Sequence, residues 1–343
     1  MARVKITETV LRDGHQSIAA TRMRLRQMLP ENVELVSGPG CPVCVTPDDY
    51  MDKAITYALR EDTIITTFGD MLKVPGSKSS LMEAKAEGAD IRIVYSPLDS
   101  IQVAKDNPDK KVIFLAVGFE TTAPTAAATV LAAKQQGIEN LYMLSAQKLV
   151  PPALRALLND PEVRVDGFIL PGHVSVITGT DVFSFLTEEY HMPGVVTGFE
   201  PLQILRSLYR LMQQVTRGEA RIENEYGSVV HEGGSPAAQR ATDLVYEPAD
   251  AAWRGIGIIP MSGLRMRDSF AAYDIERLLP LDVPMGKNKP GCRCGEVLRG
   301  IVTPKECPLF GKACVPTHAV GPCMVSVEGV CAAWYKYGQG RFS

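Results

Sequence analysis

The sequence lacks three features that would each assign the chain to a broad class of protein. No apolar run approaches the roughly 18 residues of a membrane-spanning helix; the longest, around Val112 to Phe119, has the length of a buried strand. There is no long basic segment, and the formal net charge of -3 argues against general nucleic-acid binding. No Gly-x-Gly-x-x-Gly or Walker-type loop is present, so nucleotide binding is unsupported.

Cysteine is absent from a long central stretch, although the chain contains eight cysteines. None lies between Cys44 and Cys292, so we expect the middle of the chain to be scaffold and both ends to carry the sulfur chemistry. The first five residues lack the apolar core of a signal peptide, and we therefore expect a cytoplasmic protein. In that reducing compartment, cysteines point to metal or redox chemistry rather than to structural disulfides.

The length of 343 residues and an apolar content of 45% fit two globular domains of ordinary size. Strand-like and helix-like segments alternate from residue 29 to residue 260, which is typical of βαβ units. The fold class expected is α/β, with two doubly wound parallel-sheet domains and a small cysteine-rich domain. Asp48 is expected to cap a helix that continues to about Leu59. The expected segments are 1–28, which is atypical, 29–117 and 118–260, which are α/β, and 261–343, which is cysteine-rich.

The segment Gly38–Cys44, Gly-Pro-Gly-Cys-Pro-Val-Cys, places two thiols behind a rigid turn. Its prolines and glycines exclude a regular helix or a central strand. A Cys-x-x-Cys pair in a chain without export features is typical of a redox dithiol or of half a metal site.

The C-terminal cysteines form a second group. Cys307, Cys314, Cys323 and Cys331 supply the four thiolates that a [4Fe–4S] cluster needs. Zinc also accepts four thiolates, but structural zinc sites usually contain closely spaced Cys-x-x-Cys pairs, so the spacing favours a cluster. Cys292 and Cys294 are expected to point to opposite sides of an extended segment. Simple burial is favoured for these two over a second site shared with Cys41 and Cys44.

Three polar side chains follow expected strands. Glu120 and Glu200 each belong to a Gly-Phe-Glu sequence, and His173 follows Gly172. The carboxyl ends of parallel strands are where open α/β sheets place their sites. A favourable position near a helix N-terminus explains each glutamate equally well, and a lone histidine is more often structural.

Residues 1–28 resemble the first barrel strand and the following loop of the carboxyltransferase domain of pyruvate carboxylases and oxaloacetate decarboxylases, through the sequence from Val4 to Arg24. In that family the aspartate corresponding to Asp13 binds a catalytic metal. The remaining barrel is absent, and Asp13 alone cannot form a metal site. His15 is expected to be a polar surface residue.

From about residue 25 onward, the sequence resembles the hydrogenase maturation factor family HypD. The stretches that carry the resemblance are Leu29–Leu35 with Gly38–Cys44, Val117–Thr125, Leu149–Ala153, Pro171–Ser175, Gly198–Pro201, Cys292–Gly295 and the four-cysteine tail with Gly321–Val325.

The resemblance implies a scaffold on which the Fe(CN)2CO centre of [NiFe] hydrogenase is assembled, rather than a conventional turnover enzyme. It implies one [4Fe–4S] cluster, a HypC-type small chaperone and a HypE-type cyanide donor as partners, and the hydrogenase large subunit as the indirect recipient. Cys41 and Cys44 would form a redox dithiol in electrical reach of the cluster, with Cys44 also an iron thiolate. Glu120, His173 and Glu200 would line the cleft, holding ligands or relaying protons.

One segment departs from the family pattern. The family carries Cys-Gly-Gly-His-Thr-His before the Leu-Pro-Glu-Asn stretch, and this chain has the carboxyltransferase-like start in its place. The hypothesis is that this chimeric chain keeps the fold and the cluster but has lost an iron ligand and is impaired in maturation. The alternatives are an iron–sulfur thiol–disulfide reductase without iron–cyanide cargo, and a carboxyltransferase fragment.

Overall fold

The computed structural model describes residues 4–8, 25–284, 290–326 and 328–338, and these form two compact units. Unit 1 takes its residues from 1–44, 150–236 and 289–343, and unit 2 from 45–149 and 237–288. The chain thus crosses between units after residues 44, 149, 236 and 288. The consecutive boundaries at 28, 117 and 260 stay a prediction.

Unit 2 is built on a four-stranded parallel sheet in the order β4-β3-β5-β6. Its central strand β5 reads Val-Ile-Phe-Leu-Ala-Val and is buried along that run, as expected of a strand covered on both faces. An antiparallel hairpin of β10 and β11 adds a second sheet. The strands are β3 (Thr63–Thr67), β4 (Ile91–Ile93), β5 (Lys111–Gly118), β6 (Leu141–Gln147), β10 (Tyr246–Trp253) and β11 (Gly257–Met266).

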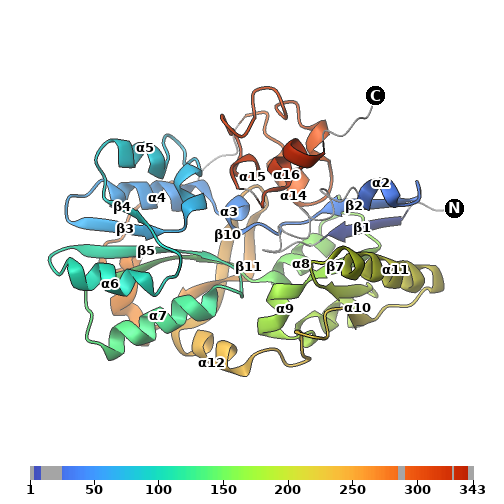
Figure 1. Cartoon of the computed structure of the whole chain (residues 1–343), viewed down its shortest axis with the longest axis horizontal. Coiled ribbons are helices and arrows are strands. Elements are labelled where there is room, and N and C mark those ends of the chain that lie inside the picture. The colour runs from blue at the N-terminus through green and yellow to red at the C-terminus, as the bar shows by residue number, and fades with distance from the viewer. Residues whose placement is uncertain (1–3, 9–24, 285–289, 327, 339–343) are drawn as a thin grey trace. The chain divides into compact units, whose positions relative to one another are not determined.

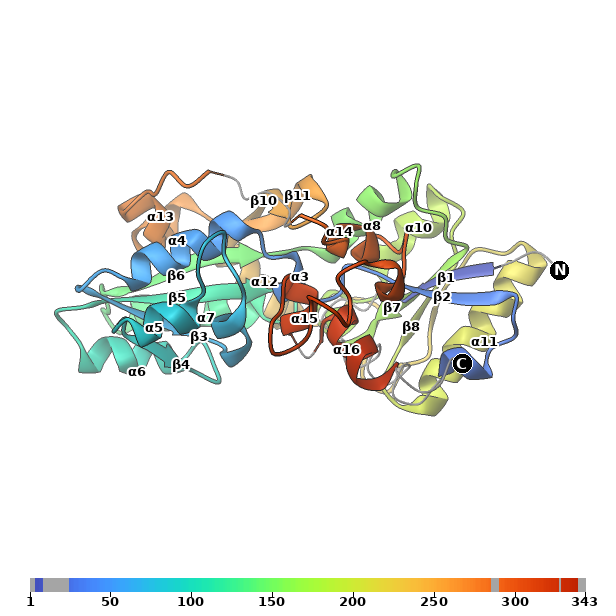
Figure 2. The ribbon, with the colours of Figure 1, turned by 90° about the horizontal axis from the view of Figure 1, so that it is seen from above.

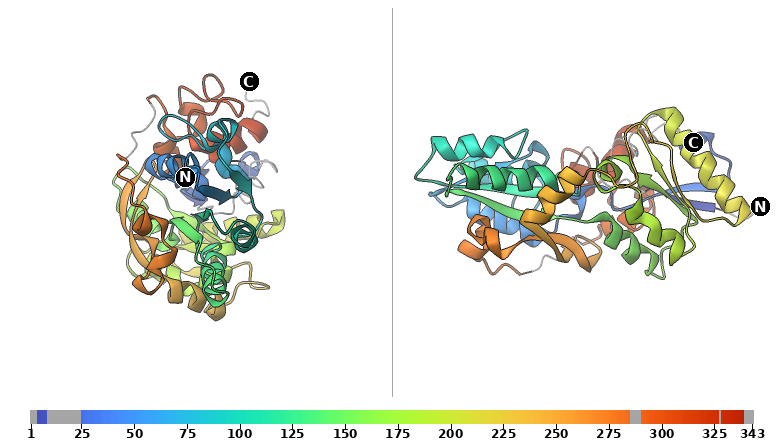
Figure 3. Two further views of the ribbon diagram at one scale, coloured as in Figure 1. Left: turned by 90° about the vertical axis from the view of Figure 1, so that its left-hand side faces the viewer. Right: turned by 90° about the horizontal axis from the view of Figure 1, so that it is seen from below.

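Helices lie on both faces of this sheet, with α4 and α5 on one side and α6 and α7 on the other (Figure 1). The second pair lies in front of the sheet when unit 2 is seen from below (Figure 3, right). Alanines of α7 pack against Phe114 and Val112 of β5, which lets the helix approach the sheet closely. The helices are α4 (Asp48–Ala58), η1 (Gly69–Lys73), α5 (Leu81–Ala86), α6 (Asp99–Asp106), α7 (Ala123–Gln135), α12 (Pro236–Val245), η3 (Asp268–Tyr273) and α13 (Ile275–Leu278).

Unit 1 contains a five-stranded parallel sheet in the order β2-β1-β7-β8-β9. The N-terminal strand β1 lies inside this sheet, paired with β2 from Val4 opposite Val33 to Glu8 opposite Ser37. Residues 4–8 are therefore part of the α/β core, although the segment 1–28 looks atypical in sequence. The strands are β1 (Val4–Glu8), β2 (Val33–Ser37), β7 (Gly167–Pro171), β8 (Gly194–Thr197) and β9 (Ile222–Asn224).

Helices α2 and α11 bury their apolar side chains against this sheet, where Leu25, Ile204, Leu208 and Leu211 join Ile6 in one core. The C-terminal helices α14 to α16 form a separate short-helix region of unit 1. The helices are α2 (Leu25–Met28), α8 (Val150–Leu158), α9 (Gly172–Thr178), η2 (Asp181–Phe183), α10 (Ser184–Glu188), α11 (Pro201–Arg217), α14 (Cys294–Leu298), η4 (Pro304–Glu306), α15 (Pro322–Val325) and α16 (Val330–Tyr337). Helix α3 (Pro42–Val45) lies where the chain leaves unit 1.

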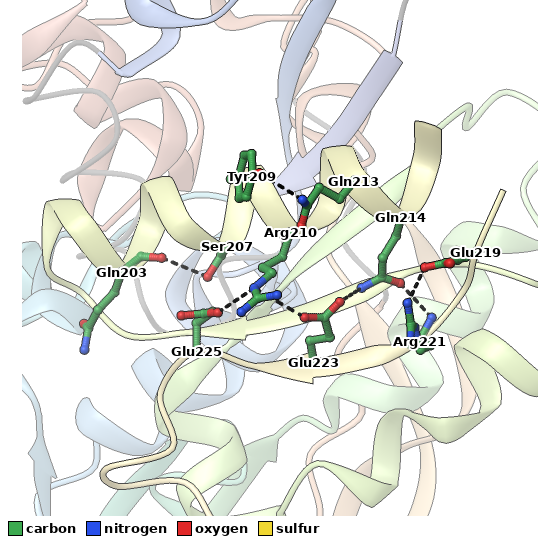
Figure 4. Close-up of polar contacts among 10 residues, drawn as sticks. All are labelled: Gln203, Ser207, Tyr209, Arg210, Gln213, Gln214, Glu219, Arg221, Glu223 and Glu225. Carbon is green, nitrogen blue, oxygen red and sulfur yellow. Dashed lines mark hydrogen bonds and ion pairs between the residues drawn. The ribbon is translucent and has the colours of Figure 1, made fainter. Parts of the chain in front are cut away.

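A polar network fixes the edge strand β9 to α11 (Figure 4). Arg210 lies between two carboxylates, 3.1 Å from Glu225 and 3.6 Å from Glu223. Gln214 donates to Glu223 at 2.7 Å and accepts from the backbone N–H of Arg221 at 2.7 Å. These contacts hold β9 and Glu225 against α11.

The expected fold class, α/β with two parallel sheets and a cysteine-rich C-terminal region, is confirmed. Within the described ranges, no helix combines the length and the apolar character needed to cross a membrane.

Candidate functional site

The Cys-x-x-Cys loop begins directly after β2. Cys41 and Cys44 are joined by a disulfide, with 5.2 Å between their Cα atoms, and their exposed fractions are 2% and 0%. The expectation that Gly38–Cys44 contains no regular helix is wrong at its end, because Pro42 begins the short helix α3, at a position where its missing N–H costs no helical hydrogen bond. Helix α3 brings the backbone N–H of Cys44 within 3.2 Å of Cys41 Sγ. A donor in this position stabilises a thiolate, so it favours the thiolate form of Cys41 once the disulfide is reduced. The two sulfurs are thus bonded to each other, and Cys41 Sγ also accepts a backbone N–H.

The six C-terminal cysteines line a single pocket in unit 1. Val297, Leu309, Phe310 and Met324 line the same pocket, so the sulfurs lie in apolar surroundings. The cysteines are Cys292, Cys294, Cys307, Cys314, Cys323 and Cys331.

The sulfur atoms approach one another closely in this pocket. Cys294 Sγ lies 2.9 Å from Cys323 Sγ. A Cβ on Gly321 would lie 2.8 Å from Cys292 Sγ, so a side chain at this position would collide with a sulfur. Burial raises the pKa of Cys331 well above its usual range, and the neighbouring Cys294 and Cys314 raise it further. Bound cations would reverse this preference, because a metal takes thiols as thiolates.

The number and placement of the sulfurs decide which metal group the pocket could hold. Among the residues that the structure describes, no group of three or more His, Cys, Asp or Glu side chains is arranged to hold a single metal ion. The cysteines instead surround a pocket, and a [4Fe–4S] cluster takes its four thiolates from different sides, one at each iron. The residues present therefore fit such a cluster, which Cys307, Cys314, Cys323 and Cys331 would hold.

The expectation that Cys292 and Cys294 point to opposite sides of an extended segment is wrong. Both line the same pocket as the other four cysteines. The expectation assumed an extended segment, whereas Arg293 is the N-cap of α14 and Cys294 is its first residue. The turn into the helix directs both sulfurs to one side. The helical sequence after Cys294, Gly-Glu-Val-Leu, is the signal that sequence reasoning overlooked.

The dithiol loop and the cysteine pocket belong to neighbouring parts of unit 1. A Cβ on Gly300, which follows α14, would lie 3.1 Å from the carbonyl oxygen of Ser37, the last residue of β2. Helices α3 and α15 also lie side by side in two perpendicular views (Figures 1 and 2). The strand that leads to Cys41 therefore packs against the turn that follows Cys294.

His173 and Glu200 lie at the carboxyl ends of adjacent strands β7 and β8. The exposed His173 ring stacks on Phe199 with 4.0 Å between centroids, and Tyr226 meets Phe199 edge-on at 5.9 Å. The backbone N–H of Glu200 donates to Gln203 Oε1 at 3.1 Å, as in a capping box at the start of α11. The two predicted site residues are thus brought to one sheet edge through Phe199.

Glu120 belongs to unit 2, where it follows β5 and is buried, with an exposed fraction of 7%. It lies at the carboxyl end of the central strand, as expected. Asp13 and His15 lie outside the described residues.

In unit 2, Asp48 has a role other than the expected one, and Lys148 was not singled out from the sequence. Asp48 does not act as the N-cap of α4, a position that Pro47 occupies; it forms a buried ion pair with Arg254. Lys148, at the end of β6, is buried in a polar pocket. Neither belongs to a recognisable motif, because the partners come from segments far apart in the chain.

Comparison with known proteins gives the family. The family model described as HypD, hydrogenase formation hypA family, matches residues 7–338, and so begins earlier than the expected residue 25. The hydrogenase maturation factor HypD of Escherichia coli (strain K12) is 44% identical over 95% of this chain and 88% of its own length. The factors of the same name from Azotobacter vinelandii and Rhodobacter capsulatus are 43% and 44% identical, each over 96% of this chain and 88% of their own length. The carboxyltransferase resemblance of residues 1–28 stays a prediction. With strands β2 to β11 and the cysteine pocket inside the matched range, the chain belongs to the HypD family of hydrogenase maturation factors.

Proposed function

We propose that the protein is a scaffold on which the Fe(CN)2CO centre of [NiFe] hydrogenase is assembled, with the iron centre as cargo and a resident [4Fe–4S] cluster. The observation that carries the proposal is the gathering of the C-terminal cysteines around one pocket of unit 1. Four of these thiolates, from Cys307, Cys314, Cys323 and Cys331, would hold the cluster, which supplies electron transfer when bound.

The disulfide between Cys41 and Cys44 supports a redox role for the loop. Reduction of this disulfide takes up two electrons and two protons, and oxidation of the dithiol returns them. A thiolate of the reduced pair is a soft ligand, which suits an iron that carries cyanide and CO. Cys44 is the proposed iron thiolate, with Cys41 as its redox partner.

Polar residues at strand ends have proposed roles in each unit separately. His173 and Glu200 follow β7 and β8 in unit 1, and Glu120 follows β5 in unit 2. We assign them to holding ligands of the iron or moving protons. The proposed partners are a HypC-type chaperone that shares the iron and a HypE-type cyanide donor.

Anaerobic purification with an iron count tests the cluster, and infrared spectroscopy tests the cargo. About four irons per chain and a broad visible absorbance are expected. Copurification with a small chaperone that carries Fe–CN infrared bands supports the scaffold. The same cluster and dithiol without such bands, in cells that make all the partners, would favour the second candidate, an iron–sulfur thiol–disulfide reductase.

We also propose that the chain is impaired in maturation, because it lacks the Cys-Gly-Gly-His-Thr-His segment. The test is complementation of a strain without its own factor. A matched chimera carries the N-terminal segment of the Escherichia coli relative in place of residues 1–28. The chimera is expected to restore hydrogenase activity and the present chain to restore little, whereas full activity from the present chain would contradict the impairment.

A further inference from the structure

A polar pocket in unit 2 has no part in the function proposed above. It lies at the end of β6 and is closed by residues from α4, from the β10–β11 hairpin and from the start of α13. Lys148 and Gly263 form an antiparallel bridge across it, and the N–H of Leu149 donates to Ser262 O at 2.8 Å. The pocket walls are therefore fixed by backbone hydrogen bonds.

Most polar groups of the pocket already have partners. Lys53 Nζ lies 2.6 Å from Glu276 Oε1, and Arg265 pairs with Glu247 at 2.5 Å. Asp274 Oδ1 accepts from the N–H of Glu276 at 3.0 Å. Asp250 Oδ1 accepts from the N–H of Met261 at 3.0 Å. These groups need no ligand.

Besides the hydroxyl of Ser145, three groups of the pocket remain without a hydrogen-bond partner among the described residues. Lys148 is 4% exposed, and its ammonium makes no hydrogen bond or ion pair within that part of the chain. Gln147 is 1% exposed, and its Oε1 accepts no hydrogen bond there. Asp49 Oδ1 is likewise buried without a donor. Burial of such groups is costly unless something satisfies them, and the three line one pocket.

The three groups define the chemistry of an occupant. Lys148 offers N–H donors, whereas Gln147 Oε1 and Asp49 Oδ1 offer only acceptors. A matching ligand presents one acceptor and at least two N–H donors. The positive charge of Lys148 faces the negative charge of Asp49, so a ligand of either net charge would leave one of the two uncompensated.

We propose that this pocket binds a small neutral primary amide. Its carbonyl oxygen accepts from Lys148 Nζ, and its NH2 group donates to Gln147 Oε1 and Asp49 Oδ1. The assignment goes beyond the maturation function, because it uses neither the cysteines nor the strand-end residues of that site.

The experiment titrates the full-length, isotopically labelled protein with three probes while the backbone resonances of the pocket residues are followed by NMR. Acetamide carries the carbonyl and both donors, N,N-dimethylacetamide lacks the donors, and acetate replaces the donors by a charge. Acetamide is expected to bind at least about tenfold more tightly than either, because the other two leave buried acceptors unpaired. Equal affinities for the three probes would overturn the proposal, as would shifts confined to residues outside the pocket.

Two lysine variants make the test specific. Lys148→Met removes the donor and keeps an unbranched side chain, and it is expected to weaken acetamide binding at least about tenfold without lowering the unfolding temperature. Lys134→Met, an exposed position on α7 of the same unit, is expected to keep the affinity. If the Lys148→Met variant bound acetamide as tightly as the wild type, this pocket could not be the acetamide site.

Discussion

Asp48 and Arg254 form an ion pair in which each side chain is only 8% exposed. The Arg254 guanidinium also donates to the carbonyl oxygen of Pro75 at 2.8 Å, and its backbone N–H donates to Val45 O at 2.9 Å. One residue of the β10–β11 turn therefore holds both the start of α4 and the residue that follows Cys44. The pair fixes the point at which the chain leaves the dithiol loop and enters unit 2.

Removal of the arginine is expected to destabilise unit 2 strongly. Arg254→Met leaves the buried Asp48 carboxylate without its cation, and the expected loss is about 3–5 kcal/mol in the free energy of unfolding. Urea unfolding followed by Trp253 fluorescence measures this loss. The chain has two tryptophans, so a Trp334→Phe background makes Trp253, which is 1% exposed, the reporter of unit 2.

Arg265→Met is the matched control for this variant. Arg265 pairs with Glu247 at the surface, where its side chain is 63% exposed, and such pairs contribute at most about 1 kcal/mol. Equal losses from the two variants would show that burial of the Asp48–Arg254 pair has no energetic consequence.

Single serine substitutions test which cysteines of the pocket are ligands of the proposed cluster. Serine at Cys307, Cys314, Cys323 or Cys331 is expected to reduce the iron content of the anaerobically purified protein well below about four per chain and to abolish its visible absorbance. Serine at Cys292 is expected to retain both, because that sulfur lines the same pocket but is not one of the four assigned ligands. Loss of iron from the Cys292 variant, with retention in one of the other four, would reassign the ligands.

Gly198 separates β8 from the residues that hold His173. A Cβ at this position would lie 2.1 Å from Gln203 Oε1 and 2.8 Å from the Tyr226 ring, so Gly198→Ala displaces both the cap of α11 and the ring that supports Phe199. The expected loss of stability is about 1–3 kcal/mol, measured as a shift in the urea midpoint of unit 1 by Trp334 fluorescence in a Trp253→Phe background. Gly227→Ala, whose nearest neighbour would be 4.0 Å away, is expected to change it by less than about 0.5 kcal/mol. Similar shifts for both variants would contradict the steric argument.

The parallel sheets could be predicted from the sequence because their signal is local. The apolar run of β5 and the Gly-Phe-Glu sequence after it identify a buried strand and the turn that follows it. The gathering of the four tail cysteines was predictable for the same reason, since they are close in sequence.

The unpredicted features depend on contacts between distant segments. The pairing of β1 with β7 joins residue 6 to residue 167, and Asp48 finds Arg254 rather than the helix end that its local sequence suggested. Cys292 and Cys294 were misjudged because their local backbone turns into a helix, which changes the directions of the side chains. Local sequence patterns predict single helices and strands, whereas a site also depends on which helices and strands come into contact.

Lys148 gives a prediction in which the sign of a pH effect is decisive. Burial lowers the pKa of Lys148 to about 8, and Asp49 opposes this shift in part. An unfolded lysine titrates near pKa 10.4, so between about pH 8 and 10 the unfolded chain binds more protons than the folded chain. The contribution of Lys148 to the free energy of unfolding therefore rises with pH across that window. At neutral pH the buried ammonium lowers the free energy of unfolding by about 3 kcal/mol.

Other groups of the protein titrate in the opposite sense. Burial raises the pKa of Tyr57 to about 12 and that of Tyr246 well above its usual range, so both contribute stability that is lost as the pH rises. The useful quantity is therefore the difference in the free energy of unfolding between the wild type and the Lys148→Met variant, from which these contributions cancel.

The Lys148→Met variant is expected to be more stable than the wild type at pH 7 by a few kcal/mol, and this difference is expected to shrink between pH 8 and 10. Urea unfolding of both proteins at matched pH values, with Trp253 as the reporter, measures the difference. A constant difference across that range would show that the Lys148 ammonium is solvated or paired, and that burial does not lower its pKa.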